Sequence, residues 1–482
     1  MDTTAKFAFL QGLGKELYTP AVSVSPSDAT TSLLAPPNAR GGVGIPLPLG
    51  TRRTLASVPF GAAAEATLSP IRRLGGMLHT AFGVLRREPH NIYNDHRAVP
   101  SVRSKFPIHA FLLQAGRAWY VDPLRHALVA LDGAGPASRA PVRLVLAGRF
   151  TDLPNSYQRL RSALLLLELG INLRMAFCAA EVFGFRPALA GIGDEQLARL
   201  LGVPPEAGWT PPMIIDLGPE EFTLRDVALP GSRLGVLEPD GIERDAILTE
   251  VIRSQDALRA VGEELRGEPG SALPAETGVG KTWAEVLWTR SSGRSPDGVD
   301  GFSGRRLRRP EAVLEELRSW ASIAPPSALL RKIGAHLSVS VCVQDIDGMP
   351  TGVYQLADEP ALARADETVM TRISEQFGYP RSPDMDSGMS AATMAWVVHA
   401  DLSALHGDFG PEAWALAQLC TGWMTQGLCL AAAAHGMYAR PARSYDEVTM
   451  QTILDLPPAE IPLLMVVVGT SRYREPALGL WT

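Results

Sequence analysis

The sequence predicts an α+β protein in which one folding unit is written twice along the chain. The first observation is a repeated pair of glycines, because Gly170 and Gly184 recur as Gly422 and Gly436, 252 residues further along. Other identities at this offset are Ala179 with Ala431, Ala180 with Ala432, Asp194 with Asp446 and Glu195 with Glu447. The match has no gap from about residue 157 to residue 200, which indicates an internal duplication. The second observation is a Gly- and Pro-rich stretch, 266–281, that separates two parts of similar size.

Length and composition support this division. A chain of 482 residues exceeds the usual size of one domain. Hydrophobic residues at 46% and charged residues at 20% exclude a wholly disordered, collagenous or coiled-coil protein. We expect an extended N-terminal arm over 1–50, a first domain over 51–265 and a second domain over 266–482. The net charge of −6 disfavours nucleic acid as a partner.

Each copy predicts the same order of elements, namely helices, a strand pair, a long apolar helix, a short helix and a last strand. The predicted hairpins are 106–114 with 119–123 in the first copy and 336–344 with 353–360 in the second. The last strands, 211–218 and 462–469, are predicted to be short, buried and to stop at a glycine. The long helices are apolar almost all round, so we expect them to be buried between other elements. Such a duplicated unit is expected to pack as a fused pseudo-dimer.

Cysteines and apolar runs place the protein in the cytoplasm by default. The cysteines are Cys178, Cys342, Cys420 and Cys429. Their spacing fits neither a zinc site nor a disulfide scaffold, so we predict buried thiols in a reducing compartment and no metal. The apolar run 163–173 is interrupted by Glu168, and no membrane span is predicted.

A phosphate-binding loop is the first candidate for a site. The segment AETGVGKT (275–282) satisfies a loose Walker A pattern with Ala275 in place of the first glycine. That mechanism needs a buried strand directly before the loop, and the preceding residues supply none. Lys281 is therefore interpreted as a solvated residue at the start of the helix TWAEVLWTR.

The second candidate is the end of that helix, RSSGR (290–294). Arg290, Ser292 and Arg294 place two guanidinium groups and a hydroxyl close together, which suits a terminal phosphate. A solvated basic helix end is the alternative interpretation. Arg472 and Arg474 follow the last predicted strand and add two further cations.

These motifs resemble those of the nitroreductase-like FMN flavoprotein superfamily. The second copy carries RSSGR (290–294), PPS (325–327), AAAAHGM (431–437) and VVVGTSRYR (466–474) in the family order. The first copy carries RRT (52–54), PS (100–101), CAAEVFGF (178–185) and MIIDLG (213–218). The resemblance covers roughly 50–482 and implies two tandem nitroreductase-like α/β/α domains.

The resemblance implies FMN sites that are shared between the copies. One site would use Arg290, Ser292, Arg294, Arg472 and Arg474 of the second copy with Pro100 and Ser101 of the first. The reciprocal site would use Arg52 and Arg53 with Pro326 and Ser327. The first copy lacks a closing arginine after RRT, and its last strand runs into acidic residues. We therefore expect one competent FMN site.

Within the superfamily the sequence is most similar to azoline dehydrogenases of ribosomal peptide biosynthesis, including thiopeptides. Those enzymes carry a Lys-Tyr pair ahead of the long helix; here Tyr157 occupies the tyrosine position and Ser156 that of the lysine. Tyr157 is the candidate catalytic base or positioning group, with Arg159 or Arg161 as a substitute cation. A tyrosine that only caps the helix is the alternative.

The resemblance also implies backbone N–H groups near flavin N5, from a turn after the long helix. For the site described above these belong to Arg443 or Ser444, whereas the first copy has Ala190 and Gly191 at the matching turn. In the second copy, the turn therefore departs from the Gly-rich turn of the family.

The predicted function is the FMN-dependent oxidation of thiazolines and oxazolines to thiazoles and oxazoles on a modified precursor peptide. A leader-binding or cyclodehydratase partner is expected, and no membrane or nucleic acid. The chain is expected to be a monomeric pseudo-dimer or a homodimer. Two alternatives remain: another flavin reductase or oxidase on the same fold, and a degenerate, flavin-free scaffold.

Overall fold

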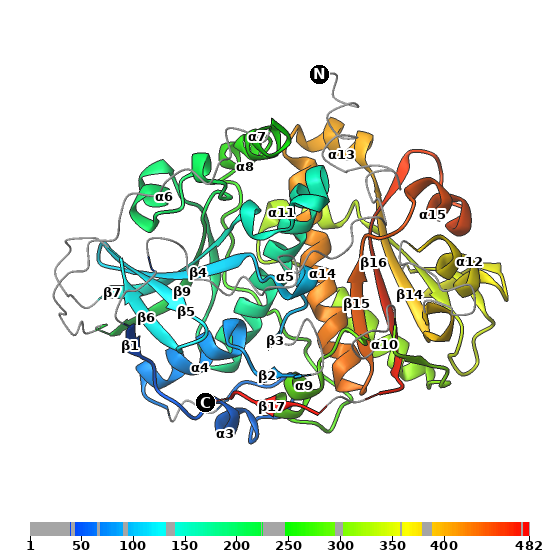
Figure 1. Ribbon diagram of the computed structural model, residues 1–482, viewed down its shortest axis with the longest axis horizontal. Coiled ribbons are helices and arrows are strands. Elements are labelled where there is room, and N and C mark those ends of the chain that lie inside the picture. The colour runs from blue at the N-terminus through cyan, green and yellow to red at the C-terminus, as the bar shows by residue number, and fades with distance from the viewer. Residues whose placement is uncertain are drawn as a thin grey trace.

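Two seven-stranded sheets flank a central pair of long helices. The computed structural model describes residues 39, 44–64, 68–89, 95–131, 140–222, 224, 246–294, 302–356, 359–377, 388–473 and 476–481. Most of the expected N-terminal arm, and Arg474, lie outside these residues. Figure 1 shows the first sheet on the left, the second on the right, and the helices α5 and α14 between them.

The first sheet has the strand order β1-β6-β5-β4-β7-β9-β8 and is antiparallel throughout. Its strands are β1 (Gly44–Pro46), β4 (Ile108–Gln114), β5 (Arg117–Asp122), β6 (Ala127–Ala130), β7 (Ala140–Gly148), β8 (Ala188–Ile192) and β9 (Met213–Phe222). The helices of this half are α3 (Thr51–Leu55), α4 (Pro70–Phe82), α5 (Arg161–Val182), α6 (Glu195–Leu201), α7 (Ala246–Arg253) and α8 (Asp256–Ala260). The predicted hairpin at 106–123 is thus confirmed as β4 and β5.

The second sheet repeats this order. It runs β10-β16-β14-β11-β12-β13, and β15 also pairs with β16. Its strands are β10 (Gly304–Arg305), β11 (Ser338–Val343), β12 (Gly352–Leu356), β13 (Pro360–Ala365), β14 (Met394–Asp401), β15 (Tyr438–Ala442) and β16 (Glu460–Ser471). The helices are α9 (Trp283–Thr289), α10 (Glu311–Ala321), α11 (Ala328–Gly334), α12 (Val369–Gln376), α13 (Leu402–Phe409), α14 (Ala413–Ala434) and α15 (Glu447–Leu454). The duplication predicted from the glycine pairs is confirmed, since β12-β11-β14-β16-β15 matches β5-β4-β7-β9-β8.

The two central helices are equivalent residue for residue. Each has 22 residues, and their first residues, Arg161 and Ala413, differ by the same 252 positions as the glycine pairs. Gly184 and Gly436 follow the two helix ends with φ of 73° and 68°, the left-handed conformation that a glycine accepts without strain. The largest hydrophobic core surrounds both helices and contains side chains of both copies. The prediction of helices buried on all sides is confirmed.

One prediction needs correction. The last strands do not stop at glycine, because β9 continues through Gly218 to Phe222 and β16 continues through Gly469 to Ser471. The segment Asn155–Val182 is long and apolar enough to pass as a membrane span by length and composition, despite Glu168. All of its apolar window is buried inside the protein, against α14 and the first sheet.

A third, small sheet ties the two ends of the chain together. Its strands are β2 (Arg86–Arg87), β3 (Asp95–His96) and β17 (Leu478–Gly479), in the order β17-β2-β3. The C-terminal segment of the second copy therefore crosses to the first copy. The four cysteines are all buried and free.

Candidate functional site

The segment Arg290–Arg294 follows α9 and lies beside β15, with Gly293 in the left-handed conformation (φ 58°). Helix α9 begins with a capping box between Thr282 and Glu285 and ends at Thr289. Arg290 has φ −57° and ψ 122°, which turns the chain out of the helix. The backbone N–H of Ala439 then donates to the carbonyl of Ser291 over 3.1 Å. The RSSGR motif is therefore a helix end followed by a loop that lies beside β15, as the sequence predicted.

Arg290 lies at the boundary between the copies. Its Nε donates to the carbonyl oxygen of Arg97 in the first copy (3.0 Å), and Arg86 Nη2 donates to the carbonyl of Arg290 (2.9 Å). Within the described part of the chain, the buried Nη1 of Arg290 has no hydrogen-bond partner. Burial and the nearby Arg86 charge lower the pKa of Arg290 to about 10. A buried guanidinium with an unused N–H is suited to bind an anion.

The loop with Pro100 and Ser101 is held by Glu168 of α5. Ser101 Oγ donates to the Glu168 carboxylate (2.9 and 3.0 Å), and the N–H of Val102 donates to Oε1 (2.7 Å). Ser101 Oγ also accepts from the N–H of Phe106 (2.8 Å), so its hydroxyl already has partners within the loop. Burial raises the pKa of Glu168 to about 8. In the sequence Glu168 interrupts an apolar run, and a lone carboxylate in such a helix is itself a signal of a functional or structural contact.

Arg294 and Arg472 lie on neighbouring backbone segments. Arg294 forms a β-bridge with Phe302, and the N–H of Ser303 donates to the carbonyl of Gly293 (2.8 Å). The N–H of Arg472 donates in turn to the carbonyl of Ser303 (2.7 Å). The structure therefore brings these two predicted arginines to one edge of the second sheet.

Two arginines that sequence reasoning missed lie at the same edge. Arg305 on β10 is paired with Thr470, and Arg309 Nη2 donates to the Thr470 hydroxyl (2.8 Å). The repulsion of Arg305 and partial burial together lower the pKa of Arg309. The run RRLRR (305–309) was the signal that could have identified them.

Arg443 and Ser444 follow the other end of β15. The Arg443 side chain is buried, with Nη2 bonded to Glu447 Oε1 (3.0 Å) and Nη1 to the carbonyl of Pro462 (3.0 Å). Ser444 is half-buried. The guanidinium of Arg443 is thus directed toward α15, away from the 290–294 segment at the start of β15.

Tyr157 lies in a short 3₁₀ helix, Asn155–Leu160, before α5, and is half-buried. The guanidinium carbon of Arg103 is 5.2 Å from its ring centroid, within the range of a cation–π contact. Arg161 instead bonds to Gln158 O and Asn155 Oδ1, both at 3.0 Å. The structure therefore places beside Tyr157 an arginine from the Pro100–Ser101 loop, which sequence reasoning did not consider.

The backbone around this pair is strained. Arg103 and Gln158 both have positive φ, 47° and 42°, which non-glycine residues rarely adopt. Ser104 and Phe106 of the same loop also have positive φ. Such strain is found disproportionately at functional sites.

The chain segment that joins the two copies occupies the place expected for the reciprocal site. The N–H of Gly267 donates to the carbonyl of Leu189 in β8 (2.8 Å), and a Cβ on Gly267 would collide with the carbonyl of Pro326. A Cβ on Gly191 would likewise collide with the carbonyl of Gly262. Polypeptide therefore fills the space between the Ala190–Gly191 turn and the Pro326–Ser327 loop.

The other residues expected at the reciprocal site are arranged differently from those of the first site. Arg52 and Arg53 are exposed, and the Arg52 guanidinium carbon lies 5.4 Å from the Trp288 ring centroid. Ser327 is fully buried, and its Oγ has no partner among the described residues. No group of three or more His, Cys, Asp or Glu side chains able to hold a metal ion is found in the ranges that the structure describes.

No protein-family model matches the sequence, and no curated protein matches it. Among solved structures, a protein of Anabaena variabilis assigned as a nitroreductase matches 90% of this chain and 93% of its own, with a TM-score of 0.62 and 14% identity. A second protein assigned as a nitroreductase, from Ralstonia eutropha, covers 42% of this chain and 88% of its own (TM-score 0.30, 18% identity). The E. coli microcin synthetase McbBCD complex with truncated pro-MccB17 covers 38% of this chain and 71% of its own (TM-score 0.30, 16% identity). The last two matches are too weak in TM-score to support an argument, whereas the first runs over both copies. The chain therefore has the nitroreductase fold, written twice in one polypeptide as a fused pseudo-dimer.

Proposed function

We propose that the protein is an FMN-dependent dehydrogenase that oxidises thiazolines and oxazolines to thiazoles and oxazoles on a modified precursor peptide. One observation carries the proposal. In a nitroreductase fold, the 290–294 segment of one copy meets the segment before Pro100 of the other, through the bond from Arg290 to Arg97. That is the pairing of segments that the sequence resemblance implies for a shared flavin site.

The residues at this boundary fit a flavin phosphate. Arg290 carries a buried N–H without a partner among the described residues, and Arg294 and Arg472 lie on adjoining segments. In the proposal these three arginines and Ser292 hold FMN, because guanidinium groups bind phosphate oxygens in pairs. When bound, the flavin supplies a two-electron acceptor, which dioxygen restores while being reduced to hydrogen peroxide.

Tyr157 and Arg103 are assigned to the proton side of the reaction. Aromatisation of an azoline removes one proton and one hydride, so a group of the protein must accept the proton. A phenol is a weak base at neutral pH, with a pKa near ~10, unless a cation stabilises its ionised form. In the proposal this cation is Arg103, whose guanidinium carbon lies 5.2 Å from the Tyr157 ring centroid. Glu168 keeps the loop that carries Arg103 in place, through Ser101 and Val102.

The substrate and partners belong to the same proposal. The substrate is a heterocycle-bearing precursor peptide, presented together with a partner protein that recognises its leader segment. A small-molecule flavin reductase on this fold would instead need a reduced pyridine nucleotide. A flavin-free scaffold would need neither.

The test begins with the visible spectrum of the purified full-length protein, which should contain the two flavin absorption bands. Incubation with a thiazoline peptide in air, without NADPH, should then remove the mass of two hydrogen atoms per ring. A spectrum without flavin, even after reconstitution with FMN, would refute both enzyme functions. Bound flavin with turnover only of small acceptors and NADPH would favour the reductase.

One double variant and one control variant test where the cofactor binds. R290A combined with R294A should release FMN and keep the fold, as judged by circular dichroism. The matched control is R143A, which removes a half-exposed arginine that pairs with Asp216 on the first sheet. Full flavin retention in the double variant would move the site elsewhere, and Arg52 and Arg53 would be tested next.

A further inference from the structure

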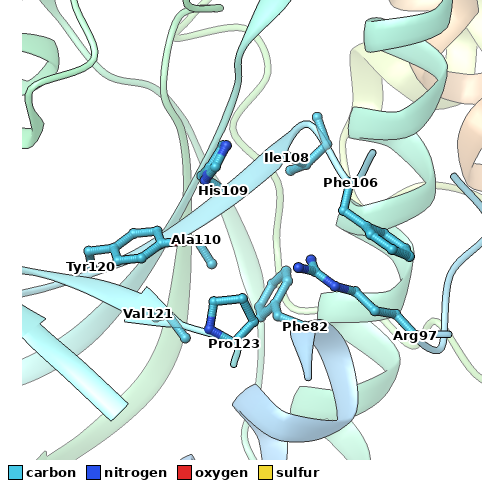
Figure 2. A pocket seen from close by; sticks show the side chains of 9 residues that line it. All are labelled: Phe82, Arg97, Phe106, Ile108, His109, Ala110, Tyr120, Val121 and Pro123. Atoms are coloured by element: carbon cyan, nitrogen blue, oxygen red, sulfur yellow. The ribbon is translucent and has the colours of Figure 1, made fainter. Parts of the chain in front are cut away.

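A small, partly open cavity lies in the first copy beside Arg97. It has a volume of about 10 Å³, and its polar lining residues are Arg97, His109 and Tyr120. The other lining residues are apolar and include Phe82, at the end of α4, and Phe106. Figure 2 shows the Arg97 guanidinium extending from the right, past Phe106, toward Phe82 and Pro123. A cavity of this size holds one water-sized particle, so neither a flavin nor an organic substrate fits.

Arg97 is a buried cation without a hydrogen-bonded counterpart. Its side chain is 4% exposed, and its guanidinium carbon lies 4.3 Å from the centroid of the Phe106 ring. Among the described residues its Nε has no hydrogen-bond partner and no carboxylate is paired with it. The contact with Arg290 uses the backbone carbonyl of Arg97 and leaves the guanidinium unoccupied. Burying a charge in this way is costly unless an opposite charge is nearby.

The carboxylates nearest Arg97 form their hydrogen bonds with other groups, and Asp95 and Glu168 act on the Arg97 charge only from a distance. Asp95 pairs with Arg87 at 2.7 Å, and Glu168 holds Ser101 and the N–H of Val102. Burial raises the pKa of Glu168 to about 8, so this group is largely neutral at pH 7. Asp152 is paired with His109 at 2.8 Å.

The phenol on the cavity wall does not neutralise Arg97 either. Burial raises the pKa of Tyr120 well above its ordinary value, so the phenol stays uncharged at neutral pH. The aromatic edges of Phe82 and Phe106 carry partial positive charge, which tolerates an anion.

We propose that this cavity binds one halide-sized anion, with chloride as its physiological occupant, against the Arg97 guanidinium. The volume limits the ligand to a monatomic ion or a water, and the unpaired buried cation favours the ion. A bound halide would neutralise the buried Arg97 guanidinium, whose backbone carbonyl accepts from Arg290 at the boundary between the copies. This inference does not depend on the flavin proposal.

Thermal unfolding of the full-length protein provides the first test. The melting temperature is measured in sodium chloride, sodium bromide and sodium gluconate at constant ionic strength and constant protein concentration. Chloride and bromide should raise it by a saturable shift, on the order of 2 °C, that gluconate does not produce. Equal melting temperatures in all three salts would overturn the proposal.

Variants assign the effect to the cavity. R97M should lose the halide-dependent shift. A110V leaves the charge intact and adds two methyl groups at the cavity wall, so it should lose the shift as well, even if R97M fails to fold. R143Q, at an exposed ion pair, should keep the shift. A shift that survives in A110V would contradict the proposal.

Crystals grown in bromide give a direct readout. An anomalous peak within contact distance of the Arg97 guanidinium is expected in the wild-type protein and not in A110V. A cavity that contains only water in wild-type crystals grown in bromide would overturn the proposal.

Discussion

Gly170 of α5 and Gly422 of α14 lie against each other where the two central helices cross. A Cβ on Gly170 would collide with the carbonyl oxygen of Leu419, and a Cβ on Gly422 would collide with that of Leu167. All four residues obey the same 252-residue offset, so the crossing point lies on the pseudo-twofold axis of the molecule. The repeated glycines are required because two helix backbones touch there.

G170A and G422A should each destabilise the protein, because a methyl group would push the helices apart. We expect a loss of about 1–3 kcal/mol in the free energy of unfolding, measured in urea, with about twice that in the double variant. Gly407 in α13 is the matched control, since a Cβ there meets nothing within 4 Å. G407A should stabilise by about 0.5–1 kcal/mol. Similar effects at Gly170 and Gly407 would contradict the close helix contact.

Glu168 should make the stability of the protein depend on pH in an unusual direction. Its pKa in the folded protein is raised from 4.5 to about 8, mainly by burial. Between those pH values the folded state therefore holds a proton that the unfolded state has lost, so the free energy of unfolding should fall as the pH rises. At pH 8 and above the penalty should be on the order of a few kcal/mol.

E168Q provides the measurement for this prediction. Glutamine can still accept the N–H of Val102, but it does not ionise. Urea unfolding at several pH values between 5 and 8.5 should show a smaller decline in the variant than in the wild-type protein. E263Q is the control, because Glu263 is exposed and pairs only with Arg266 at the surface. Parallel pH curves for wild type and E168Q would contradict the raised pKa.

The duplicated fold could be predicted from the sequence because its signals are local and periodic. The glycine pairs, the apolar helices and the hairpin at 106–123 were all visible in the pattern of residues. The ends of the last strands were not, because Gly469 pairs with Tyr438 in the ladder, and pairing of β9 with β7 resumes at Glu221 beyond an irregularity that contains Gly218. Pairing across a sheet depends on tertiary neighbours, which a sequence pattern does not contain.

The candidate site was only partly predictable for the same reason. The RSSGR segment and Arg472 were identified from residue type alone. Arg103 was missed because its contact with Tyr157 joins a strained loop to a 3₁₀ helix more than fifty positions away in the sequence. The 266–281 segment was interpreted as a boundary region, and the position of its Gly267 between β8 and Pro326 arises from contacts with both copies.

That segment leads to a prediction about stoichiometry, which depends on the flavin proposal. The space between Gly191 and Pro326 is filled by the chain, so the full-length protein should bind one FMN per polypeptide. Flavin released by denaturation should be compared with protein concentration from amino-acid analysis. A ratio near two would show that the segment moves aside.

The same segment should be protected from solvent exchange even without flavin. Ser271 Oγ donates to Glu181 of α5 (2.7 Å), and the N–H of Ala272 donates to the same carboxylate. Amide hydrogen exchange at Gly267 and Ala272 should therefore be slow, and E181A should accelerate it at Ala272. Fast exchange at both amides in the wild-type protein would contradict a fixed segment.

The buried pair of Arg443 and Glu447 should stabilise the second copy, and its exposed counterpart in the first should not. Both Arg443 and Glu447 are buried, and their side chains meet at 3.0 Å. R443M would leave the Glu447 charge buried and unpaired, so a loss of about 3–5 kcal/mol is expected. The double variant R443M/E447M should recover most of this lost stability. The equivalent of Glu447 is Glu195, whose pair with Arg199 is about 60% exposed, so R199M should cost less than about 1 kcal/mol.

The same two variants also distinguish an effect of the Arg443 side chain on the flavin from an effect of its backbone N–H group. The proposed contribution to the flavin at this turn comes from a backbone N–H group, which R443M retains. In the double variant with E447M the reduction potential of bound flavin should therefore remain that of the wild-type protein, while the single R443M variant shows the loss in stability. If the potential changes in the double variant although stability is recovered, the Arg443 guanidinium itself acts on the flavin, and its assignment to a structural ion pair is wrong.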